Sequence, residues 1–347
     1  MTKDLLGMTM DELKAFATEM GEKPFRGKQL FVWINRGVRE FDRMTDLPAS
    51  FRQRLRETAC VGRIRILETQ HDRHDGTRKF LFGFGTGAVE AVEAVFMKYR
   101  YGNTLCVSSQ IGCRMGCRFC ASALGGYVRD LTAGEMLGQV LMAEADTGET
   151  INHIVVMGMG EPFDNYENLA GVLRLLHDPD GKNMSYRNMT VSTSGLIPGI
   201  RRFAKDFPQA GLAISLHRLT DEGRSRIMPV NRKYPLEELF KAARDYTEET
   251  GRRVSFEYAL IRGENDRNED VALLKKRLRG MLCHINLIPL NRVAETGFEG
   301  SGRKRAEEIA CELDKAGISA TVRRELGADI DGACGQLRLR RGKAQML

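Results

Sequence analysis

GCRMGCRFCAS, residues 112–122, places Cys113, Cys117 and Cys120 within one short segment. The preceding residues, TLCVSSQ (104–110), predict a strand, so the three cysteines are expected in the loop that follows it. Three thiolates can hold three irons of a 4Fe-4S cluster, which ordinarily takes four cysteines. One iron then keeps an open coordination position, and the motif predicts a cluster that binds a further ligand there.

S-adenosylmethionine (SAM) can occupy that position through its amino and carboxylate groups. An electron from the cluster then breaks the sulfonium bond and gives a 5′-deoxyadenosyl radical, chemistry that cofactors rather than side chains supply. The competing interpretation is a zinc site with a histidine as its fourth ligand. The x3-then-x2 spacing is less usual for zinc, no second cysteine pair follows, and no histidine lies close by in the sequence. Three unrelated core cysteines are a second alternative, which the crowding of the motif disfavours.

From about residue 103 onward, strand-like and helix-like segments alternate. The strand candidates are 104–110, 152–158, 189–194, 211–216, 253–261, 284–290 and 319–325. Helical periodicity lies between most of them, as in 135–145, 166–176, 236–249 and 271–281. Thr132 and Glu135 predict a capping box before the first of these helices. The predicted fold class is α/β, a parallel sheet or partial (β/α) barrel with sites at the carboxyl ends of its strands.

The first hundred residues follow a different pattern. Apolar residues recur at helical spacing between residues 8 and 58, whereas 62–98 read as short antiparallel strands separated by turn-like HDGT and GTG. We therefore expect four parts along the chain. They are a helical accessory domain at 1–60, an antiparallel β extension at 61–100, the (β/α) barrel core at 101–325, and a C-terminal loop with a basic tail at 326–347.

Composition indicates a globular protein that favours polyanions. The chain of 347 residues is 42% hydrophobic and 29% charged, with a formal net charge of +7. Basic residues outnumber acidic ones 13 to 9 in residues 1–65, and the tail carries Arg338, Arg340, Arg341 and Lys343. Such patches attract nucleic acid through counterion release. No apolar run is long enough for a membrane span, and the N-terminus lacks a secretory signal, so a cytoplasmic location is expected.

Several motifs together resemble those of the RlmN/Cfr family of radical SAM RNA methyltransferases. The resemblance covers nearly the whole chain, and the motifs occur in the family's order. They are TLCVSSQIGCRMGCRFCAS (104–122), GGYVRDLTAGEMLGQV (125–140), MGMGEP (157–162), VSTSG (191–195), AISLH (213–217), INLIPLN (285–291) and DIDGACGQL (329–337).

The resemblance implies roles for three residues outside the cluster motif. Cys334 matches the cysteine that carries a methyl group, and Cys106 matches the cysteine that forms a disulfide with it to release a covalent protein–RNA adduct. Glu93 matches the acceptor of the ring proton, with Glu90 as a nearby competitor. Without the resemblance, Cys334 and Cys106 would be packing cysteines and Glu93 a solvated strand carboxylate. Cys60, Cys283 and Cys311 are expected to be packing residues.

The resemblance also implies a set of SAM contacts, each at or just beyond a predicted strand end. Glu161 is expected to accept hydrogen bonds from the methionyl ammonium, whereas His217 taken alone would be a satisfied core histidine. The positions are Gly160, Glu161, Ser192, Ser215, Leu216, His217 and Asn291. The chain departs from the family at two places. Arg218 stands where a small residue is common and is expected to meet RNA phosphate or solvent, and residues 296–305 lack a Ser-Ser pair.

The resemblance implies methylation of adenosine C2 in 23S rRNA at the peptidyl-transferase centre and in tRNA next to the anticodon. Two SAM molecules per turnover, an external one-electron donor and a monomeric enzyme belong to this expectation. The runner-up is a Cfr-like enzyme that methylates C8 of the ribosomal adenosine and confers antibiotic resistance. Two other classes stay open on the residues alone: a zinc-containing RNA-binding module, and a radical SAM enzyme that acts on a small molecule or peptide.

Overall fold

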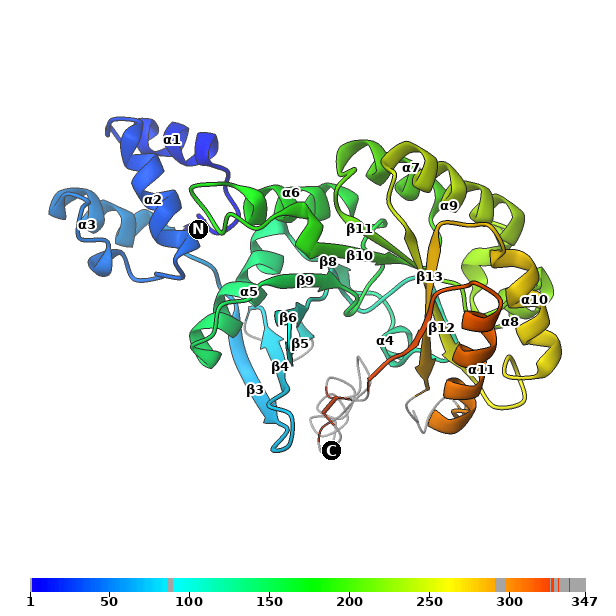
Figure 1. Cartoon of the computed structure of the whole chain (residues 1–347). Coiled ribbons are helices and arrows are strands. Elements are labelled where there is room, and N and C mark those ends of the chain that lie inside the picture. The colour runs from blue at the N-terminus through cyan, green and yellow to red at the C-terminus, as the bar shows by residue number, and fades with distance from the viewer. Residues whose placement is uncertain are drawn as a thin grey trace.

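The computed structural model describes residues 2–85, 90–290, 297–324, 326–327, 330 and 337. Its centre is one ten-stranded sheet in the order β14-β13-β12-β11-β10-β9-β6-β5-β4-β3 (Figure 1). Seven of these strands run parallel: β6 (Gly102–Cys106), β9 (His153–Val156), β10 (Met189–Thr193), β11 (Gly211–Ser215), β12 (Val254–Leu260), β13 (Cys283–Pro289) and β14 (Ala320–Val322). Within the described residues β14 and β3 are its edges, so the predicted α/β class and the open barrel are confirmed.

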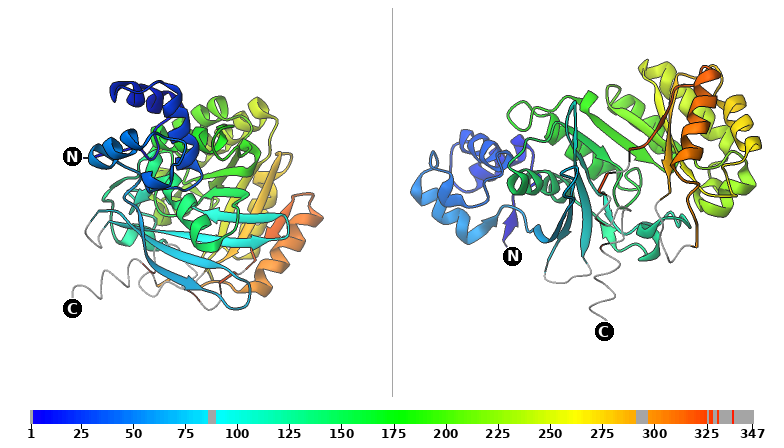
Figure 2. Two further views of the ribbon diagram at one scale, coloured as in Figure 1. Left: turned by 90° about the vertical axis from the view of Figure 1, so that its left-hand side faces the viewer. Right: turned by 60° about the horizontal axis from the view of Figure 1, so that its bottom comes forward.

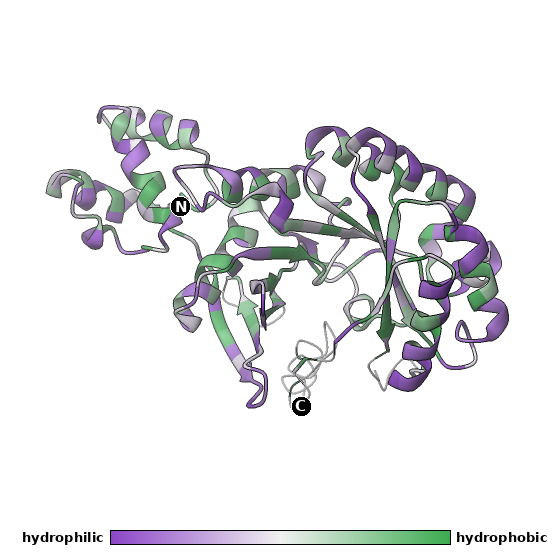
Figure 3. Cartoon of the chain, viewed as in Figure 1, coloured by the Kyte–Doolittle hydropathy of each residue, from purple (hydrophilic) through white to green (hydrophobic). Residues whose placement is uncertain are grey.

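Helices cover the outer face of the parallel strands (Figure 1). They are α5 (Ala133–Thr147), α6 (Tyr166–His177), α7 (Ile197–Asp206), α8 (Asp221–Ile227), α9 (Leu236–Thr250), α10 (Asn268–Leu278) and α11 (Arg303–Lys315). The predicted capping box of α5 is present, because Thr132 and Glu135 each accept a hydrogen bond from the other's backbone N–H. Apolar residues lie mainly on the strands and the inner helix faces, as Figure 3 shows by colour.

The antiparallel strands expected at 61–100 continue the main sheet. β3 (Arg65–His71), β4 (Arg78–Gly83) and β5 (Ala91–Tyr99) pair in sequence, and β5 then pairs antiparallel with β6. On its other side β6 pairs parallel with β9, so β6 joins the two halves of the sheet. The proposed boundary near residue 100 therefore falls inside one hydrogen-bonded ladder. The right-hand view of Figure 2 shows this continuity.

The N-terminal helices α1 (Met10–Glu19), α2 (Phe25–Asn35) and α3 (Ala49–Thr58) lie beside the barrel (Figures 1 and 2). β1 (Lys3–Asp4) and β2 (Ala59–Cys60) pair at their base. Gly7 and Gly134 pack so closely that a Cβ on Gly7 would lie 2.4 Å from the backbone nitrogen of Gly134. This approach ties the N-terminal segment to the start of α5. No helix in the described part of the chain is long and apolar enough to cross a membrane.

Candidate active site

The cysteine loop lies between β6 and the short helix α4 (Ala121–Leu124). β7 (Gln110–Ile111) and β8 (Arg129–Asp130) form a small ribbon that closes its base. Gly112 has a positive φ of 79°, and a Cβ there would lie 1.6 Å from the carbonyl oxygen of Gly126, so this turn requires glycine. On the opposite side, the N–H of Arg118 donates to the carbonyl of Ile227 at 2.9 Å. The loop is thus held at both ends.

The three thiols of the loop lie within electrostatic reach of one another. Burial raises the pKa of Cys113 to about 12, and burial together with the charges of Cys120 and Cys113 raises the pKa of Cys117. No three His, Cys, Asp or Glu side chains among the described residues are placed to hold a single metal ion. In a 4Fe-4S cluster each thiolate binds its own iron, so a site for one ion is not the required geometry. Positive irons would offset the cost of ionising these thiols, and the donor set fits the cluster.

Glu161 lies in the turn that follows β9 and is 2% exposed. Its carboxylate accepts hydrogen bonds from the Thr193 hydroxyl at 2.8 Å, the Ser194 N–H at 2.7 Å and the Phe163 N–H at 3.1 Å. Burial raises the pKa of Glu161, and its charge in turn raises the pKa values of Cys113 and Cys117. A carboxylate has about four acceptor positions, so one remains for a ligand cation beside the cysteine loop.

The MGMGEP turn is packed tightly against the cysteine loop. A Cβ on Gly160, whose φ is +101°, would lie 2.7 Å from the backbone nitrogen of Gln110. The side chain of Gln110 accepts from the Glu161 N–H at 2.8 Å and donates to Asp130 and Asp164 at 2.8 and 3.0 Å. Gly160 therefore serves close backbone packing, and Gln110 links the loop to the Glu161 turn.

His217 follows β11 with a positive φ of 53°, which is unusual for a residue other than glycine. Its Nδ1 accepts from the Ala259 N–H at 2.9 Å, so a neutral ring carries its proton on Nε2. Burial, with the charge of Arg224, lowers the pKa of His217 to about 3. The ring also meets Phe119 of the cysteine loop edge-on, with centroids 4.9 Å apart. This neutral histidine is at the same time a satisfied core residue and a neighbour of the loop.

The other predicted SAM contacts are distributed around these groups. Ser192 and Ser215 are half-buried on the ends of β10 and β11. Leu216 is fully buried, so only its backbone could meet a ligand, and its carbonyl already accepts from Arg224 at 3.1 Å. Asn291 lies outside the described residues.

Arg224 is a component that the sequence analysis missed. It comes from α8, is fully buried, and donates to the carbonyls of Ser194 at 2.6 Å and Ser215 at 2.9 Å. It also donates to Asn231 at 3.0 Å. Burial lowers the pKa of Arg224 to about 10, and its charge acts on Cys117. One guanidinium thus joins the ends of β10 and β11 beside the cysteine loop. In the sequence, DEGRSRI looks like an exposed charged helix, and only its burial reveals the role.

A second cluster of predicted residues occupies β4, β5 and β6. Glu93 is 1% exposed and forms an ion pair with Lys79, in which nitrogen and oxygen are 2.8 Å apart. Cys106 is buried, and its pKa is raised by burial. Leu337 is buried against Leu81 and Ala91. Cys334 itself lies outside the described residues, as does the basic tail at 338–347.

Two expectations from the sequence were wrong, those for Cys311 and for residues 303–305. Arg218 is mostly buried, with a side chain that is 11% exposed and ion-paired with Glu264, and its contact with RNA phosphate stays a prediction. Cys311 is exposed on α11 and not a packing residue. Residues 303–305 begin helix α11 and do not continue a loop. The seven cysteines in the described ranges are all free, and the expected disulfide involves the undescribed Cys334.

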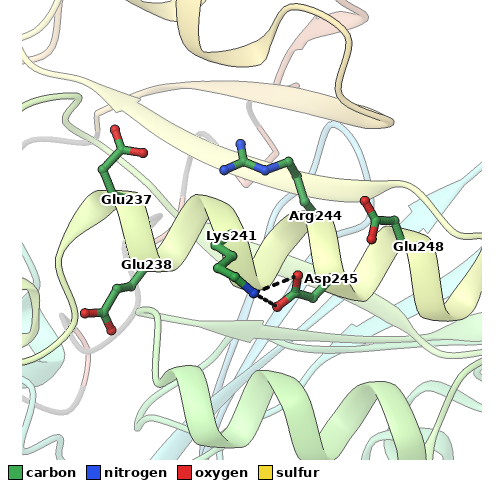
Figure 4. A pocket seen from close by; sticks show the side chains of 6 residues that line it. All are labelled: Glu237, Glu238, Lys241, Arg244, Asp245 and Glu248. Atoms are coloured by element: carbon green, nitrogen blue, oxygen red, sulfur yellow. Dashed lines mark hydrogen bonds and ion pairs between the residues drawn. The ribbon is translucent and has the colours of Figure 1, made fainter.

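A shallow hollow runs along the outer face of α9, lined by Glu237, Glu238, Lys241, Arg244, Asp245 and Glu248 (Figure 4). All six side chains come from one helix, and Lys241 pairs with Asp245 at 3.1 Å. This is a solvated charged helix face, on the side of the sheet away from the cysteine loop (Figure 1).

The open barrel, with three clustered thiols beside a buried glutamate, defines a radical SAM protein. Residues 107–274 match the family model of the Radical SAM superfamily, whose members hold a 4Fe-4S cluster and SAM. Residues 3–61 match the model described as the ribosomal RNA large subunit methyltransferase N-terminal domain.

Full-length comparisons agree with both models. A probable dual-specificity RNA methyltransferase RlmN of Alkaliphilus oremlandii is 49% identical over 335 residues, covering 96% of this chain and 97% of its own. The equally named protein of Symbiobacterium thermophilum is 47% identical over 346 residues, covering 99% and 93%. The crystal structure of a radical SAM methyltransferase from Sphaerobacter thermophilus superposes with a TM-score of 0.91 at 43% identity, covering 96% and 98%. The chain belongs to the RlmN family.

Proposed function

We propose that this chain methylates C2 of adenosine in 23S rRNA at the peptidyl-transferase centre, and in tRNA next to the anticodon. The observation that carries the proposal is the joint presence of two structures on one sheet. One is the cysteine loop with Glu161 at the parallel strand ends, and the other is the Glu93 and Cys106 cluster on β5 and β6. The names of the relatives support RNA as the substrate class.

Cys113, Cys117 and Cys120 would hold the cluster, and Glu161 would receive the ammonium of SAM. When bound, the cluster and SAM supply a one-electron cleavage that yields a hydrogen-abstracting radical, with electrons from an external donor. Glu161 suits this role because it is buried and keeps an acceptor position after three hydrogen bonds. Ser192, Ser215, Leu216, His217, Gly160 and Asn291 complete the proposed contacts.

Cys334 would carry the methyl group that becomes bonded to the adenine ring. A carbon centre on this sulfur can attack an electron-poor ring carbon, which has no lone pair for an ordinary methyl transfer. Glu93 would then take the ring proton, and the remaining unpaired electron would pass to an external one-electron carrier. Cys106, as a thiolate, would attack the sulfur of Cys334, so that an S–S bond forms while the bond between that sulfur and the transferred carbon breaks. The transferred carbon would take up a proton to become the methyl group, and a transient disulfide would remain. Burial raises the pKa of Cys106, so its thiol needs a nearby proton acceptor or cation to react.

The position of Leu337 supports this assignment of Cys334. Leu81 of β4 lies directly opposite Glu93 of β5, so both side chains are on one face of the sheet. Leu337 packs against Leu81 on that face, three residues after Cys334. Leu337 therefore lies on the same face of the sheet as the proposed base.

RNA would be bound as a partner with its target base turned out of the stack, because a base inside a duplex cannot reach the site. Only some of the basic side chains in residues 1–65 are available to bind RNA. Arg39 donates to three backbone carbonyls of the protein, and Arg54 pairs with Glu22. We further propose that the protein acts as a monomer in the cytoplasm, where its rRNA and tRNA substrates occur.

The test is a reconstituted reaction analysed by mass spectrometry of nucleosides. Oxygen-protected protein, SAM, a reductant and either a 23S rRNA fragment or tRNA should give 2-methyladenosine together with 5′-deoxyadenosine. The Cys334→Ala variant should give no 2-methyladenosine in either RNA. The Cys311→Ala variant, in which an exposed cysteine is replaced, should match the unaltered protein. Finding 8-methyladenosine alone would assign the Cfr-like activity instead. Full activity of Cys334→Ala would reject the methyl-cysteine route.

A further inference from the structure

Lys79 and Glu93 form a fully buried ion pair on neighbouring strands. Each side chain is 1% exposed, and the Lys79 nitrogen lies 2.8 Å from a carboxylate oxygen of Glu93. Lys79 is paired across the strands with Val95, and Val95 is paired with Cys106. Because residues opposite one another share a face, and alternate residues along a strand do too, Lys79, Glu93 and Cys106 project to the same side of the sheet.

A buried lysine in this position is not explained by stability. Lysine is almost never fully buried unless paired, and a buried ion pair is often no more stabilising than apolar residues of the same volume. The surroundings offer that apolar alternative, because Leu81 and Ala91 on the same face are fully buried. A cation placed here therefore points to a task that an apolar residue would not perform.

Other charged groups also act on this cluster. The electrostatic surroundings of Cys106 include Lys79, Glu93 and Arg323, the last of which follows β14. Tyr99 on β5 also lies within reach of Cys106 and Arg323, and burial raises the pKa of Tyr99. Lys79 is a cation in direct contact with the Glu93 carboxylate. The charge of Arg323 acts to lower the pKa values of Cys106 and Tyr99, against the larger effect of burial.

We propose that Lys79 is a positioning residue that keeps Glu93 ionised and fixed in place to accept the ring proton. This inference rests on the proposed function, in which Glu93 is the base. In that step the C2–H bond of the covalent adduct breaks, the proton goes to a carboxylate oxygen of Glu93, and the bonding electrons remain on the ring. No oxidant or reductant enters this step. Lys79 does not touch the RNA in this scheme and acts on the reaction through Glu93.

The direction in which loss of Lys79 should change the pH dependence of the reaction follows from the burial of Glu93. A carboxyl group in an apolar site favours its neutral form, and an adjacent cation favours the ionised one. Removing the cation should therefore favour the neutral form of Glu93, which cannot accept a further proton. Raising the pH should restore the base.

The test compares Lys79→Met with Lys98→Met in the full reaction with SAM, a reductant and an rRNA fragment. Lys98 is the matched control, because it also pairs with a glutamate, Glu149, but is 46% exposed. For Lys79→Met we expect the low-pH limb of the rate profile to move to higher pH. Covalent protein–RNA adduct should accumulate at neutral pH, while 5′-deoxyadenosine still forms. Lys79→Arg, which keeps the cation, should retain the original limb.

Two results would overturn the proposal. One is a Lys79→Met variant that loses rate equally at every pH, as a purely structural residue would. The other comes from infrared difference spectra between the unaltered protein and Glu93→Gln, which do not require a Lys79 variant to fold. They should show an ionised carboxylate at neutral pH, and a protonated carboxylic acid would contradict the inference. If the unaltered protein produces no methyladenosine at all, the proposed function fails instead, and the two failures are distinguishable.

Discussion

Arg224 donates a hydrogen bond to the backbone carbonyl of Ser194 at 2.6 Å, while the backbone N–H of Ser194 donates to the carboxylate of Glu161 at 2.7 Å. One peptide segment at the end of β10 is thereby held between a buried cation and a buried carboxylate. The cation also bonds the carbonyl of Ser215 on β11. The spacing of two strand ends that face the cysteine loop thus depends on a single side chain from α8.

Arg224→Met should lower the free energy of unfolding by about 3–5 kcal/mol, because several buried hydrogen bonds to a charged group are lost at once. The matched control is Arg226→Met, two residues along α8, where the side chain is 55% exposed and pairs with Glu264. The control should cost about 1 kcal/mol or less. Denaturant unfolding of both variants measures the difference. Equal losses of unfolding free energy in the two variants would show that the buried hydrogen bonds of Arg224 contribute no more than the exposed ion pair of Arg226.

Replacing any one of Cys113, Cys117 and Cys120 with alanine should abolish the brown colour and most of the bound iron after anaerobic reconstitution. Two thiolates would have to hold a cluster that ordinarily takes four. Iron analysis and visible absorption provide the measurement, and Cys311→Ala serves as the control. Colourless, iron-free unaltered protein would favour the zinc alternative.

Glu161→Gln should weaken SAM binding by about tenfold or more, which corresponds to about 1.4 kcal/mol. The amide removes the negative charge and turns one acceptor oxygen into a donor that faces the Thr193 hydroxyl or the Ser194 N–H. Equilibrium dialysis with SAM measures this, with exposed Glu167→Gln on α6 as the control. Unchanged affinity would remove Glu161 from the proposed SAM site.

His217 predicts a pH-dependent loss of stability. The pKa of the buried ring is lowered to about 3 from an ordinary 6.5, so below pH 6.5 the unfolded chain binds a proton that the folded protein does not. Its stabilising contribution is therefore complete above pH 6.5 and declines as the pH falls toward 3, by up to about 1.4 kcal/mol per unit. Unfolding at pH 7 and pH 5 should show a smaller pH effect in His217→Gln. The half-buried His153→Gln should retain the effect of the unaltered protein.

The sequence predicted best those features whose signals are local. The capping box at Thr132 and Glu135 and the tight cysteine loop depend on residues a few positions apart, and the structure has both. Strand and helix alternation likewise predicted the open barrel. α7 was not among the helices named from the sequence, because it is short and has Pro198 near its start. α11 was not named either, because its first residues, 303–305, follow the loop-like GSG of 300–302.

Arg224 and Lys79 could not be predicted because burial of a charged side chain depends on distant elements. In RKFLFG both faces of β4 are buried, so the alternation does not tell which face receives Lys79. The ion pair of Arg218 could not be predicted for the same reason, since its partner Glu264 lies 46 residues away. The residue roles taken from the family, including Cys334 and Asn291, remain predictions.

The junction at β6 also has a consequence for engineering. Because β5 and β9 flank β6 on its two sides, residues 61–100 cannot be cut out or exchanged as a cassette without baring the backbone amides of a strand that ends at Cys106. Such an exposed edge invites aggregation. Chimaeras within this family should therefore be joined in the connection before β3, where the helical N-terminal part ends, so that the whole sheet comes from one parent.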